Sequence, residues 1–438
     1  MAEIPALDLT PAHPAESPSA VIPTSAVVAT VLGNALEFYD FTTYAFFAVM
    51  IGHAFFPAQD PFVSLLLSVA AFGVGFITRP LGGIVIGAYA DRAGRKPAMM
   101  LSIGLMAVGM VMLAATPSYA AIGLAAPLLV ILARLLQGFA LGGEVGPSTS
   151  YLLEAAPAGK RGQYGAWQIA SQGAASALAG LLGVLLSFLL DDAAMQSWGW
   201  RIPFIVGVAI VPVGLIMRSR LQETVDLGAR TTHSSARHVL SALLKYHLRP
   251  LVLALMLITS GTIATYIGVY MTTYALSTLH MATGASMGAT VVVGLCLLVF
   301  GSIGGWLSDR VGRKPVYLVS KLALTAVAYP AFVAINRHHT LAALLLMAGL
   351  MSALNALGGV VLVVIPELFP KSVRSAGLST VYAVAVTVFG GTTQVVVAWL
   401  IHVTGDPLSP AWYLISTSAI GIVAILMVAE TRDVALAD

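Results

Sequence analysis

A polar segment of eleven residues occurs twice in this chain, and this repeat restricts the possible folds more than any other feature of the sequence. The first copy is Gly87-Ala-Tyr-Ala-Asp91-Arg92-Ala-Gly94-Arg95-Lys96-Pro97, and the second is Gly305-Trp-Leu-Ser-Asp309-Arg310-Val-Gly312-Arg313-Lys314-Pro315. Seven of the eleven positions are identical, and the copies are 218 residues apart in a chain of 438. Because each copy lies between long apolar stretches, we expect two polar hinges, each joining two membrane helices, in a chain built by internal duplication.

The composition excludes an ordinary soluble protein. Hydrophobic residues make up 58% of the chain and charged residues 9%, whereas roughly a quarter of a soluble protein is charged. Apolar runs long enough to cross a hydrocarbon core of about 30 Å recur along the sequence. The single cysteine, Cys296, lies in one of these runs, so no disulfide framework is expected. Residues 1–25 are rich in Pro, Ala and Ser and contain no Lys or Arg, which is typical of a disordered tail and not of a signal peptide.

The apolar runs predict an all-α membrane protein with twelve transmembrane helices in two six-helix halves. The longest polar connection divides the runs six and six. The expected spans are 27–54, 63–90, 98–116, 121–147, 163–190, 202–218, 247–274, 284–308, 315–336, 341–366, 374–401 and 411–430. The chain is accordingly divided into a disordered cytoplasmic tail (1–26), an N-terminal bundle (27–218), a cytoplasmic linker (219–246), a C-terminal bundle (247–430) and a cytoplasmic tail (431–438).

The basic residues indicate the orientation of the chain in the membrane. Seventeen of the 22 Lys and Arg residues fall in alternate connections or in the C-terminal tail. Loops rich in Lys and Arg stay in the cytoplasm. We therefore expect a multi-pass protein of the bacterial inner membrane with both termini in the cytoplasm.

A second repeat supports the division into halves. Glu154 and Arg161 follow the fourth span, and Glu367 and Arg374 follow the tenth, with a proline three residues after each glutamate. Two unrelated segments thus repeat at nearly the same separation, which is expected of a duplicated chain.

Twelve spans in two related halves, with a G-x-x-x-D-R-x-G-R-K hinge after spans 2 and 8, resemble the major facilitator superfamily. Arg134-Leu-Leu-Gln137-Gly138 is similar to the span-4 motif of that superfamily. Narrower features resemble its metabolite–proton symporter family, whose members import citrate, 2-oxoglutarate, shikimate, or proline and betaine. These features are Gly33-Asn34-Ala-Leu-Glu37-Phe-Tyr-Asp40-Phe41, Phe76-Ile-Thr-Arg79-Pro80-Leu-Gly-Gly, Gly142-Gly143-Glu144 and Trp198-Gly-Trp200-Arg201-Ile-Pro203-Phe204.

Within that family the chain has a particular likeness to bacterial citrate–proton symporters and their tricarballylate relatives. The likeness rests on Ile122-Gly-Leu-Ala-Ala-Pro127, Arg134-Leu-Leu-Gln-Gly-Phe139, Leu221-Gln-Glu-Thr224 and Thr404-Gly-Asp406-Pro-Leu-Ser-Pro-Ala-Trp412. Phe38-Tyr39-Asp40 departs from the Gln-Phe-Asp expected in the citrate carriers, and the aromatic residues of the seventh span are rearranged.

Charges inside the membrane are costly, about 2.5–3.5 kcal/mol each at the bilayer centre, so each one requires a reason. Arg79 lies twelve residues before Asp91, about 18 Å along a helix and hence near the midplane. It either pairs with an acid to lock spans 1 and 2 together, or it is a fixed cation for a substrate carboxylate, to which the guanidinium fork is matched. Lys321 is expected to extend its amine back to the second hinge, which leaves the C-terminal half without a deep cation.

Proton coupling needs a carboxylate whose proton affinity depends on what else is bound. Glu37, Asp40 and Glu144 are the acids inside the expected spans, and each could lie beside Arg79 or Arg134. Burial raises and a nearby arginine lowers the proton affinity of such a group. We hypothesise that substrate occupying the arginine frees the acid, which then takes up a proton.

Polar side chains recur at helical spacing on several spans and predict the lining of a substrate cavity. Taken singly, each could equally be an interhelical hydrogen bond worth about 0.6 kcal/mol. The candidate substrate-binding residues are Asn34, Tyr44, Arg79, Arg134, Gln137, Gln168, Gln172, Tyr266, Tyr270, Asn355, Tyr382 and Gln394.

The two hinges and the Glu/Arg repeat are candidates for a cytoplasmic gate. Asp91 and Asp309 could cap the following helix or bind an arginine of the other half, or the basic residues could merely retain the loops in the cytoplasm. The candidate gate residues are Asp91, Arg92, Arg95, Asp309, Arg310, Arg313, Glu154, Arg161, Glu367 and Arg374.

These features predict a proton-coupled secondary transporter that imports a citrate-like di- or tricarboxylate by alternating access. Import of shikimate, 2-oxoglutarate, betaine or proline, export of a metabolite, and a non-transporting membrane receptor are the alternatives. The sequence has no ATP-binding Gly-rich loop, no metal-ligand cluster and no nucleophile–base set outside the bilayer, so an enzyme is not expected. We expect no cofactor besides the coupling ion, H⁺ or alternatively Na⁺, no nucleic-acid partner, and a monomer in the lipid bilayer.

Overall fold

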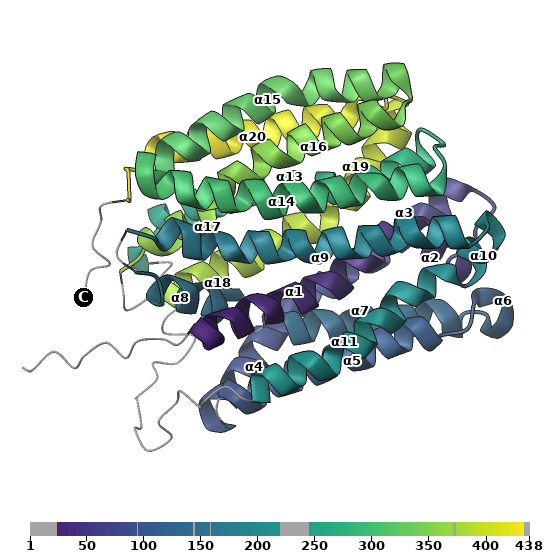
Figure 1. The fold of residues 1–438 in the computed structure, drawn as a ribbon, viewed down its shortest axis with the longest axis horizontal. Coiled ribbons are helices and arrows are strands. Elements are labelled where there is room, and N and C mark those ends of the chain that lie inside the picture. The colour runs from purple at the N-terminus through teal and green to yellow at the C-terminus, as the bar shows by residue number, and fades with distance from the viewer. Residues whose placement is uncertain are drawn as a thin grey trace, which may run out of the picture.

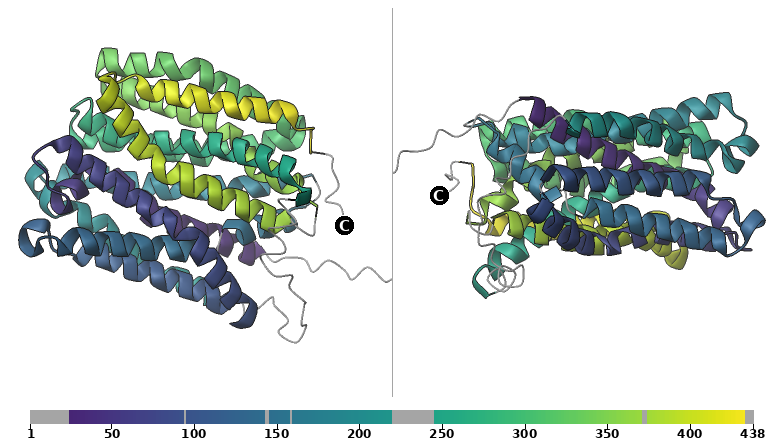
Figure 2. Two further views of the ribbon diagram at one scale, coloured as in Figure 1. Left: turned by 180° about the vertical axis from the view of Figure 1, so that it is seen from behind. Right: turned by 90° about the horizontal axis from the view of Figure 1, so that it is seen from below.

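The computed structural model describes residues 24–93, 95–142, 145–157, 159–219, 245–370 and 374–432, and all regular structure in them is helical. The long helices run side by side, roughly parallel and antiparallel to one another (Figure 1). The two further views show the same slab of helices from behind and from below (Figure 2).

The helices of the N-terminal half follow the expected spans closely. A short 3₁₀ turn, Gly199–Arg201, precedes the last of them. The helices are α1 (Thr24–Phe46), α2 (Ala48–Phe55), α3 (Pro61–Ile77), α4 (Arg79–Ala93), α5 (Arg95–Ala115), α6 (Tyr119–Ile122), α7 (Ala125–Leu141), α8 (Val145–Glu154), α9 (Arg161–Leu189), α10 (Asp192–Ser197) and α11 (Ile202–Ser219).

The C-terminal half has the same plan. A 3₁₀ turn (Gly358–Val360) and a π-helical segment (Val386–Gly390) lie inside two of its spans. The helices are α13 (Leu248–Ser277), α14 (Thr283–Val311), α15 (Arg313–His338), α16 (Leu341–Leu357), α17 (Val361–Glu367), α18 (Arg374–Ala385), α19 (Gly391–Thr404) and α20 (Ser409–Met427).

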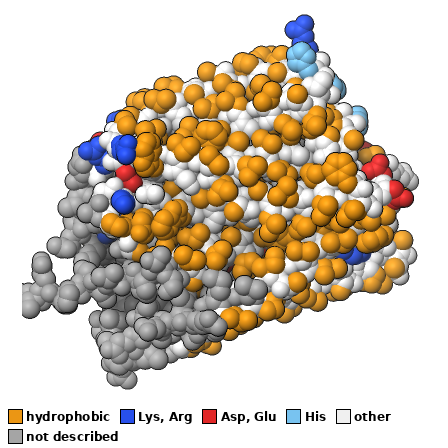
Figure 3. Space-filling view, in the orientation of Figure 1, with side chains coloured by type: hydrophobic (Ala, Val, Ile, Leu, Met, Phe, Trp, Pro, Cys, Tyr) orange, Lys and Arg blue, Asp and Glu red, His pale blue; other side chains and the backbone are white. Residues whose placement is uncertain are grey.

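The outer surface of the bundle suits a lipid environment. In the described part of the chain, ten helical stretches are long and apolar enough to cross a membrane, and Ala125–Leu141 is a shorter apolar helix. Large apolar side chains such as Phe188 and Leu128 are exposed. On the face shown in Figure 3, apolar side chains cover most of the described surface and the few charged ones gather at its ends. A helix that is apolar on its outward face as well as inside the bundle is a membrane helix.

Some expected spans are interrupted, and the interruptions have local causes. The span predicted at 63–90 ends at Ile77 as α3 and restarts at Arg79 as α4. Pro80 is the second residue of α4 and has no backbone N–H to donate to the preceding turn, so a helix can restart here but cannot continue unbroken through it. The span predicted at 374–401 contains the π-helical segment, a distortion that is frequent at functional sites.

The two halves meet chiefly along α9 and α14, with a second contact between α3 and α19. The second hinge lies where α14 ends and α15 begins, and we call this side of the bundle the hinge end. The last described residues lie on the same side, because Glu430 accepts from the backbone N–H groups of Arg313 and Lys314.

Candidate functional site

A cavity with an empty volume of about 680 Å³ lies between the two halves. Helices of both halves line it: α1 and α9 from one, and α13, α14 and α16 to α18 from the other. Four predicted substrate-binding residues are among the lining residues, namely Gln172, Tyr266, Asn355 and Tyr382. Along α13 the cavity extends from Ile258 to Tyr266, so it lies at the middle of this helix.

Two arginines are buried close together beside this cavity. The Cζ atoms of Arg79 and Arg134 lie 4.7 Å and 4.9 Å from the centroid of the same ring, that of Phe41. The guanidinium of Arg79 also lies against Phe76, and that of Arg134 against Tyr44. Both side chains are buried. Cation–π contacts stabilise these charges without neutralising them, so positive charge is retained beside the cavity.

The local sequence explains why the two arginines meet. Arg79 is the first residue of α4, directly after the break at Thr78, whose hydroxyl donates to the carbonyl oxygen of Leu135 at 2.6 Å. On α7, one turn from Arg134, a Cβ atom on Gly138 would lie 1.5 Å from the carbonyl oxygen of Gly75. Only glycine permits that backbone approach, which brings Arg134 on α7 against α3 and the start of α4.

The hydrogen-bonding capacity of this arginine pair is largely unused within the protein. Nη1 of Arg134 donates to Oε1 of Gln137 at 2.7 Å. The Nε and Nη2 atoms of Arg134 and the Nε atom of Arg79 are buried and have no hydrogen-bond acceptor among the described residues. Guanidinium donors in this state are suited to bind an anion, for which a carboxylate offers two acceptor oxygens.

A buried acid accompanies the arginines. Asp40 is 1% exposed, and both of its carboxylate oxygens lack a hydrogen-bond partner among the described residues. It interacts electrostatically with Arg134, although the two do not form a salt bridge within 4.0 Å. Glu37, one turn away on α1, is buried as well. A buried carboxylate without hydrogen bonds is the arrangement in which taking up a proton is favourable.

An aromatic cluster of Phe41, Phe72, Phe76 and Tyr266 packs against the arginines, and its member Tyr266 also lines the cavity. The Tyr266 ring on α13 lies 5.7 Å from Phe76 and 6.3 Å from Phe41, so the cluster joins both halves. Arg79 lies close enough to Tyr266 and Tyr382 to interact electrostatically with both phenols, and both line the cavity. Arg79 is therefore the arginine with the more direct access to the C-terminal half.

Several predicted substrate-binding residues have other partners in this structure. The Asn34 amide donates to Ser171 Oγ and to the carbonyl oxygen of Gln168, and the Gln168 amide donates to Ser148 and Thr149, all within the N-terminal half. The Tyr44 hydroxyl donates to the carbonyl oxygen of Ser68 at 3.3 Å.

Gln394 and Tyr270 also lie away from the cavity. Gln394 is buried, and its amide atoms have no partner among the described residues. Tyr270 lies in the apolar core of the C-terminal half and does not line the cavity, because it is one helical turn beyond Tyr266, where α13 has passed the end of the cavity.

The expectation for Lys321 is wrong. Its amine does not extend to the hinge end but is buried in the C-terminal half, where it donates to Asn355 Oδ1 at 3.0 Å and to the carbonyl oxygen of Ser260 at 3.3 Å. Lys321 is eight residues from Arg313, the start of α15, or roughly 12 Å along the helix, which is too far for the side chain to reach the surface. The separation of eight residues from Arg313 is the sequence signal that could have predicted the burial of Lys321.

At the hinge end, Asp309 connects the two halves. Its carboxylate accepts hydrogen bonds from the backbone N–H groups of Gly162 (2.8 Å) and Gln163 (2.9 Å), in the first turn of α9. It also binds Arg313 Nη1 at 2.7 Å. The predicted contact with an arginine of the other half is thus replaced by one with a helix N-terminus, whose unpaired N–H groups and positive partial charge attract a carboxylate.

Glu367 adds a second connection at the hinge end. Its carboxylate lies 3.5 Å from Arg313 Nη2 and 3.9 Å from Arg161 Nη1, and Arg161 belongs to the other half. Arg374 Nε donates to the carbonyl oxygen of Pro366, within the C-terminal half. The guanidinium of Arg310 lies 4.1 Å from the Trp306 ring of its own helix.

The remaining candidate residues cannot be compared with the structure. Glu144 lies outside the described residues, as do the side chains of Asp91, Arg92, Arg95 and Glu154.

The end of the bundle opposite the hinges is closed as well. Phe62 of α3 stacks on His402 of α19, with ring centroids 3.7 Å apart. The Thr387 hydroxyl, in the π-helical segment, donates to the carbonyl oxygen of Phe76 at 3.1 Å. The two halves are therefore in contact at both ends of the bundle.

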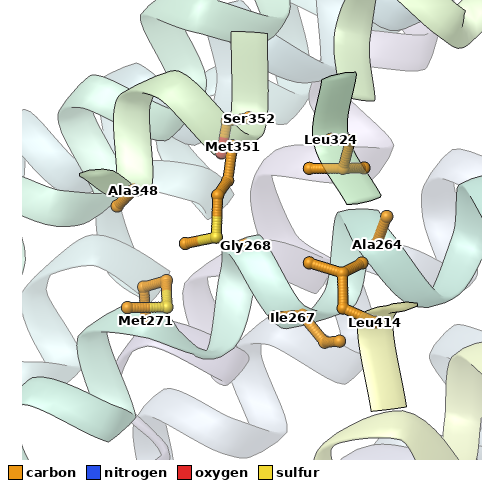
Figure 4. A pocket seen from close by; sticks show the side chains of 9 residues that line it. All are labelled: Ala264, Ile267, Gly268, Met271, Leu324, Ala348, Met351, Ser352 and Leu414. Atoms are coloured by element: carbon orange, nitrogen blue, oxygen red, sulfur yellow. The ribbon is translucent and has the colours of Figure 1, made fainter. Parts of the chain in front are cut away.

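A second cavity of about 250 Å³ lies inside the C-terminal half, between α13, α15, α16 and α20. Figure 4 shows that side chains such as Met271, Met351 and Leu324 surround it. Ser352 is the one lining residue with a polar side chain, so this cavity offers no charge to an anionic ligand.

Comparison with known proteins decides the family. The family model described as "Sugar (and other) transporter" matches residues 25–245 and again residues 218–437. The chain belongs to the major facilitator superfamily. Two successive matches in one chain agree with the two related halves.

Individual members of the superfamily match over most of their length. The "Citrate-proton symporter" of Klebsiella pneumoniae is 38% identical over 94% of this chain and 93% of its own. The "Glycine betaine/proline/ectoine/pipecolic acid transporter OusA" of Dickeya dadantii is 32% identical over 93% of this chain and 83% of its own. A crystal structure of a D-xylose–proton symporter superposes with a TM-score of 0.75, at 19% identity, over 93% of this chain and 98% of that one.

Membership of the major facilitator superfamily confirms the predicted fold of twelve helices in two halves. It also confirms the expectation of a multi-pass membrane transporter and not an enzyme. In the described part of the chain, no group of His, Cys, Asp and Glu could hold a metal ion.

Proposed function

We propose that this protein is a proton-coupled symporter that imports a citrate-like di- or tricarboxylate by alternating access. The observation that carries the proposal is the pair of buried guanidinium groups, Arg79 and Arg134, with unused donors beside a cavity between the halves. The relative of 38% identity that is named a citrate–proton symporter supports this substrate class.

Charge explains why the substrate would be an anion. Asp40 interacts with Arg134, whereas the groups that attract Arg79 are the phenols of Tyr266 and Tyr382. A carboxylate ligand would supply the missing acceptors in bidentate geometry and would compensate the second positive charge. Tyr266, Tyr382 and Gln172, which line the cavity, would then bind the remaining oxygens of the substrate.

Asp40 is the coupling acid in this proposal, with Glu37 as the second candidate. In this proposal, Arg134 pairs electrostatically with Asp40 while the substrate is absent. When a substrate carboxylate binds the arginines, their charge is shared and the buried acid takes up a proton. Substrate and proton therefore bind together, which is the requirement for symport.

Alternating access would exchange the contacts at the two ends. Asp309 with the N-terminus of α9, and Glu367 with Arg161, would hold the hinge end closed. Phe62 and His402 would hold the opposite end. The distribution of Lys and Arg supports a cytoplasmic hinge end, with both termini on that side, in the inner membrane of a bacterium.

Uptake of a zwitterion such as betaine or proline is the second candidate. The aromatic cluster favours it, because aromatic faces bind quaternary ammonium groups. A relative named as a betaine and proline transporter is 32% identical to this chain. In this structure, however, the arginines already lie over the rings of Phe41, Phe72 and Phe76.

Thermal unfolding of the purified protein tests the substrate class. Citrate, tricarballylate, succinate, shikimate, betaine and proline are added in turn, and a bound ligand raises the melting temperature by mass action. We expect stabilisation by a di- or tricarboxylate. Stabilisation by betaine or proline alone would favour the second candidate, and no stabilisation by any carboxylate would contradict the proposal.

A further inference from the structure

The C-terminal half contributes a buried cation to the neighbourhood of the cavity. Lys321 lies on α15, at the outside of the bundle in Figure 1, and yet its side chain points inward and is 1% exposed. Its ammonium contacts α13 through the carbonyl oxygen of Ser260 and α16 through the amide of Asn355. The Tyr317 ring, one turn away, lies 5.8 Å from Nζ.

The protein does not neutralise this charge. No carboxylate among the described residues lies within salt-bridge distance of Lys321. An ammonium group has three donors, and Ser260 and Asn355 accept from two of them. Burying a cation without an acid partner costs several kcal/mol. An apolar side chain of similar length, such as Met, would fill the same space without that cost. A buried amine at this position therefore has no packing advantage over an apolar side chain, and an anion beside it would stabilise its protonated form.

One side chain separates Lys321 from the cavity. Asn355 lines the cavity, accepts from Lys321 with Oδ1, and donates with Nδ2 to the Thr265 hydroxyl at 3.0 Å. Thr265 lines the cavity too. Gly358, also in the lining, would bring a Cβ atom within 3.8 Å of Lys321 Cε. The lysine stem thus lies directly behind the cavity wall, and rotation of a single amide would open a path to its ammonium.

We propose that Lys321 is a second carboxylate-binding cation, supplied by the C-terminal half, which the substrate reaches by replacing the Asn355 amide as the acceptor. This inference rests on the proposed carboxylate transport and deepens it. Arg79 would bind one carboxylate from the N-terminal half and Lys321 another from the C-terminal half. The pair then selects anions with two or more carboxylates over monocarboxylates. A substrate held by both halves would also draw them together around it.

Binding measurements on the purified full-length protein test this role. Citrate, succinate and acetate are titrated against wild type, Lys321→Met, Lys321→Arg and Arg337→Gln. Arg337 is the matched control, because it is an exposed cation on the same helix. We expect Lys321→Met to weaken citrate binding on the order of 10- to 100-fold, the effect of losing a charged hydrogen bond, and acetate binding far less. Lys321→Arg should retain more of the citrate affinity than Lys321→Met, and Arg337→Gln should bind citrate as wild type does.

The Asn355→Ala variant should change citrate affinity in the opposite direction to Lys321→Met. It also provides a test of the inference if Lys321→Met does not fold. Removing the amide exposes the ammonium to the cavity, so citrate affinity should be retained or increased. A loss of citrate affinity in Asn355→Ala would show that the amide and not the lysine binds the substrate, and would overturn the inference. If Lys321→Met binds citrate as tightly as wild type does, the inference about Lys321 fails and the proposed function stands. If the wild-type protein binds no carboxylate, the proposed function fails as well.

Discussion

Arg79 and Arg134 share one aromatic ring: the Cζ atom of each lies within 5 Å of the centroid of Phe41, at 4.7 Å and 4.9 Å. Like charges in a low-dielectric interior repel, so this pair is costly unless an anion lies nearby. Asp40 is the buried acid that interacts with Arg134, whereas Arg79 interacts with the phenols of Tyr266 and Tyr382. The arrangement is therefore interpreted as a site prepared for a negatively charged ligand.

Replacing the arginines should weaken substrate binding in a graded way. We expect Arg79→Gln to raise the dissociation constant of citrate about 10- to 100-fold, since a hydrogen bond to a charged group contributes about 1.5–3 kcal/mol. Arg79→Lys should restore part of the affinity, because it keeps the charge and loses the fork. Citrate is titrated into the purified protein, and its binding is measured as the rise in melting temperature. Unchanged citrate binding in Arg79→Gln would exclude Arg79 from the site.

Removing the charge of Asp309 should loosen the hinge end. Asp309→Asn weakens the interaction with the N-terminus of α9, which contributes about 1 kcal/mol. We therefore expect the ratio of open to closed forms to rise about five-fold. Opening is measured with a Thr262→Cys substitution in a chain that also carries Cys296→Ser. Residue 262 lines the cavity, so the rate at which its cysteine reacts with an impermeant maleimide reports how often the cavity opens. Asp60→Asn is the control, because Asp60 caps α3 at the opposite end. Equal labelling in the two variants would contradict the gate.

Gly138→Ala should destabilise the protein. The added methyl group would lie 1.5 Å from the carbonyl oxygen of Gly75, and overpacking of this kind costs about 1–3 kcal/mol. Gly87→Ala is the matched control, because nothing lies within 4 Å of a Cβ atom there. We expect a lower melting temperature for Gly138→Ala alone. Equal melting temperatures would show that α3 and α7 do not approach so closely.

Glu430 should stabilise the hinge end in a pH-dependent way. Burial raises the pKa of Glu430, but backbone N–H groups of Arg313, Arg432, Lys314 and Thr431 donate to its carboxylate, and together they lower that pKa below its usual value of about 4.3. A group whose pKa is lowered by folding stabilises the folded state above its unfolded-state pKa, and this contribution is lost as the pH falls through the lowered value.

We therefore expect Glu430→Gln to melt below wild type at pH 7. The difference should begin to shrink below a pH of about 4.3 and should disappear once the pH is below the lowered pKa of Glu430. A difference in melting temperature that persists unchanged in acid well below that pKa would mean that the carboxylate charge is not what stabilises the start of α15.

The repeats and the apolar runs were sufficient to predict the fold, because each span is a long local signal. The breaks within spans were not predicted, although Pro80 is a local signal for the one at Thr78. Helix ends agree to within a few residues, as for α9, expected at 163–190 and observed at Arg161–Leu189.

Contacts between distant residues were harder to predict. Helical spacing places Tyr266 and Tyr270 on one face of α13, but it does not say where along the helix the cavity ends. The depth of Lys321 could have been read from its distance to Arg313, whereas its partners on α13 and α16 depend on how those helices pack. Likewise, nothing local in the sequence indicates that Asp309 would reach the first turn of α9, 147 residues away from Gly162.

Proton-driven uptake of citrate into proteoliposomes tests the central claim most directly. We predict that wild-type protein accumulates labelled citrate when the outside is acidified, and that this accumulation ceases when a protonophore removes the gradient. Asp40→Asn should lose accumulation and keep citrate exchange in the absence of a gradient, because it lacks the group that takes up the proton. Glu37→Gln, measured in parallel, distinguishes the two candidate acids. Citrate accumulation by wild type that is independent of the pH gradient, or no citrate transport at all, would contradict the account.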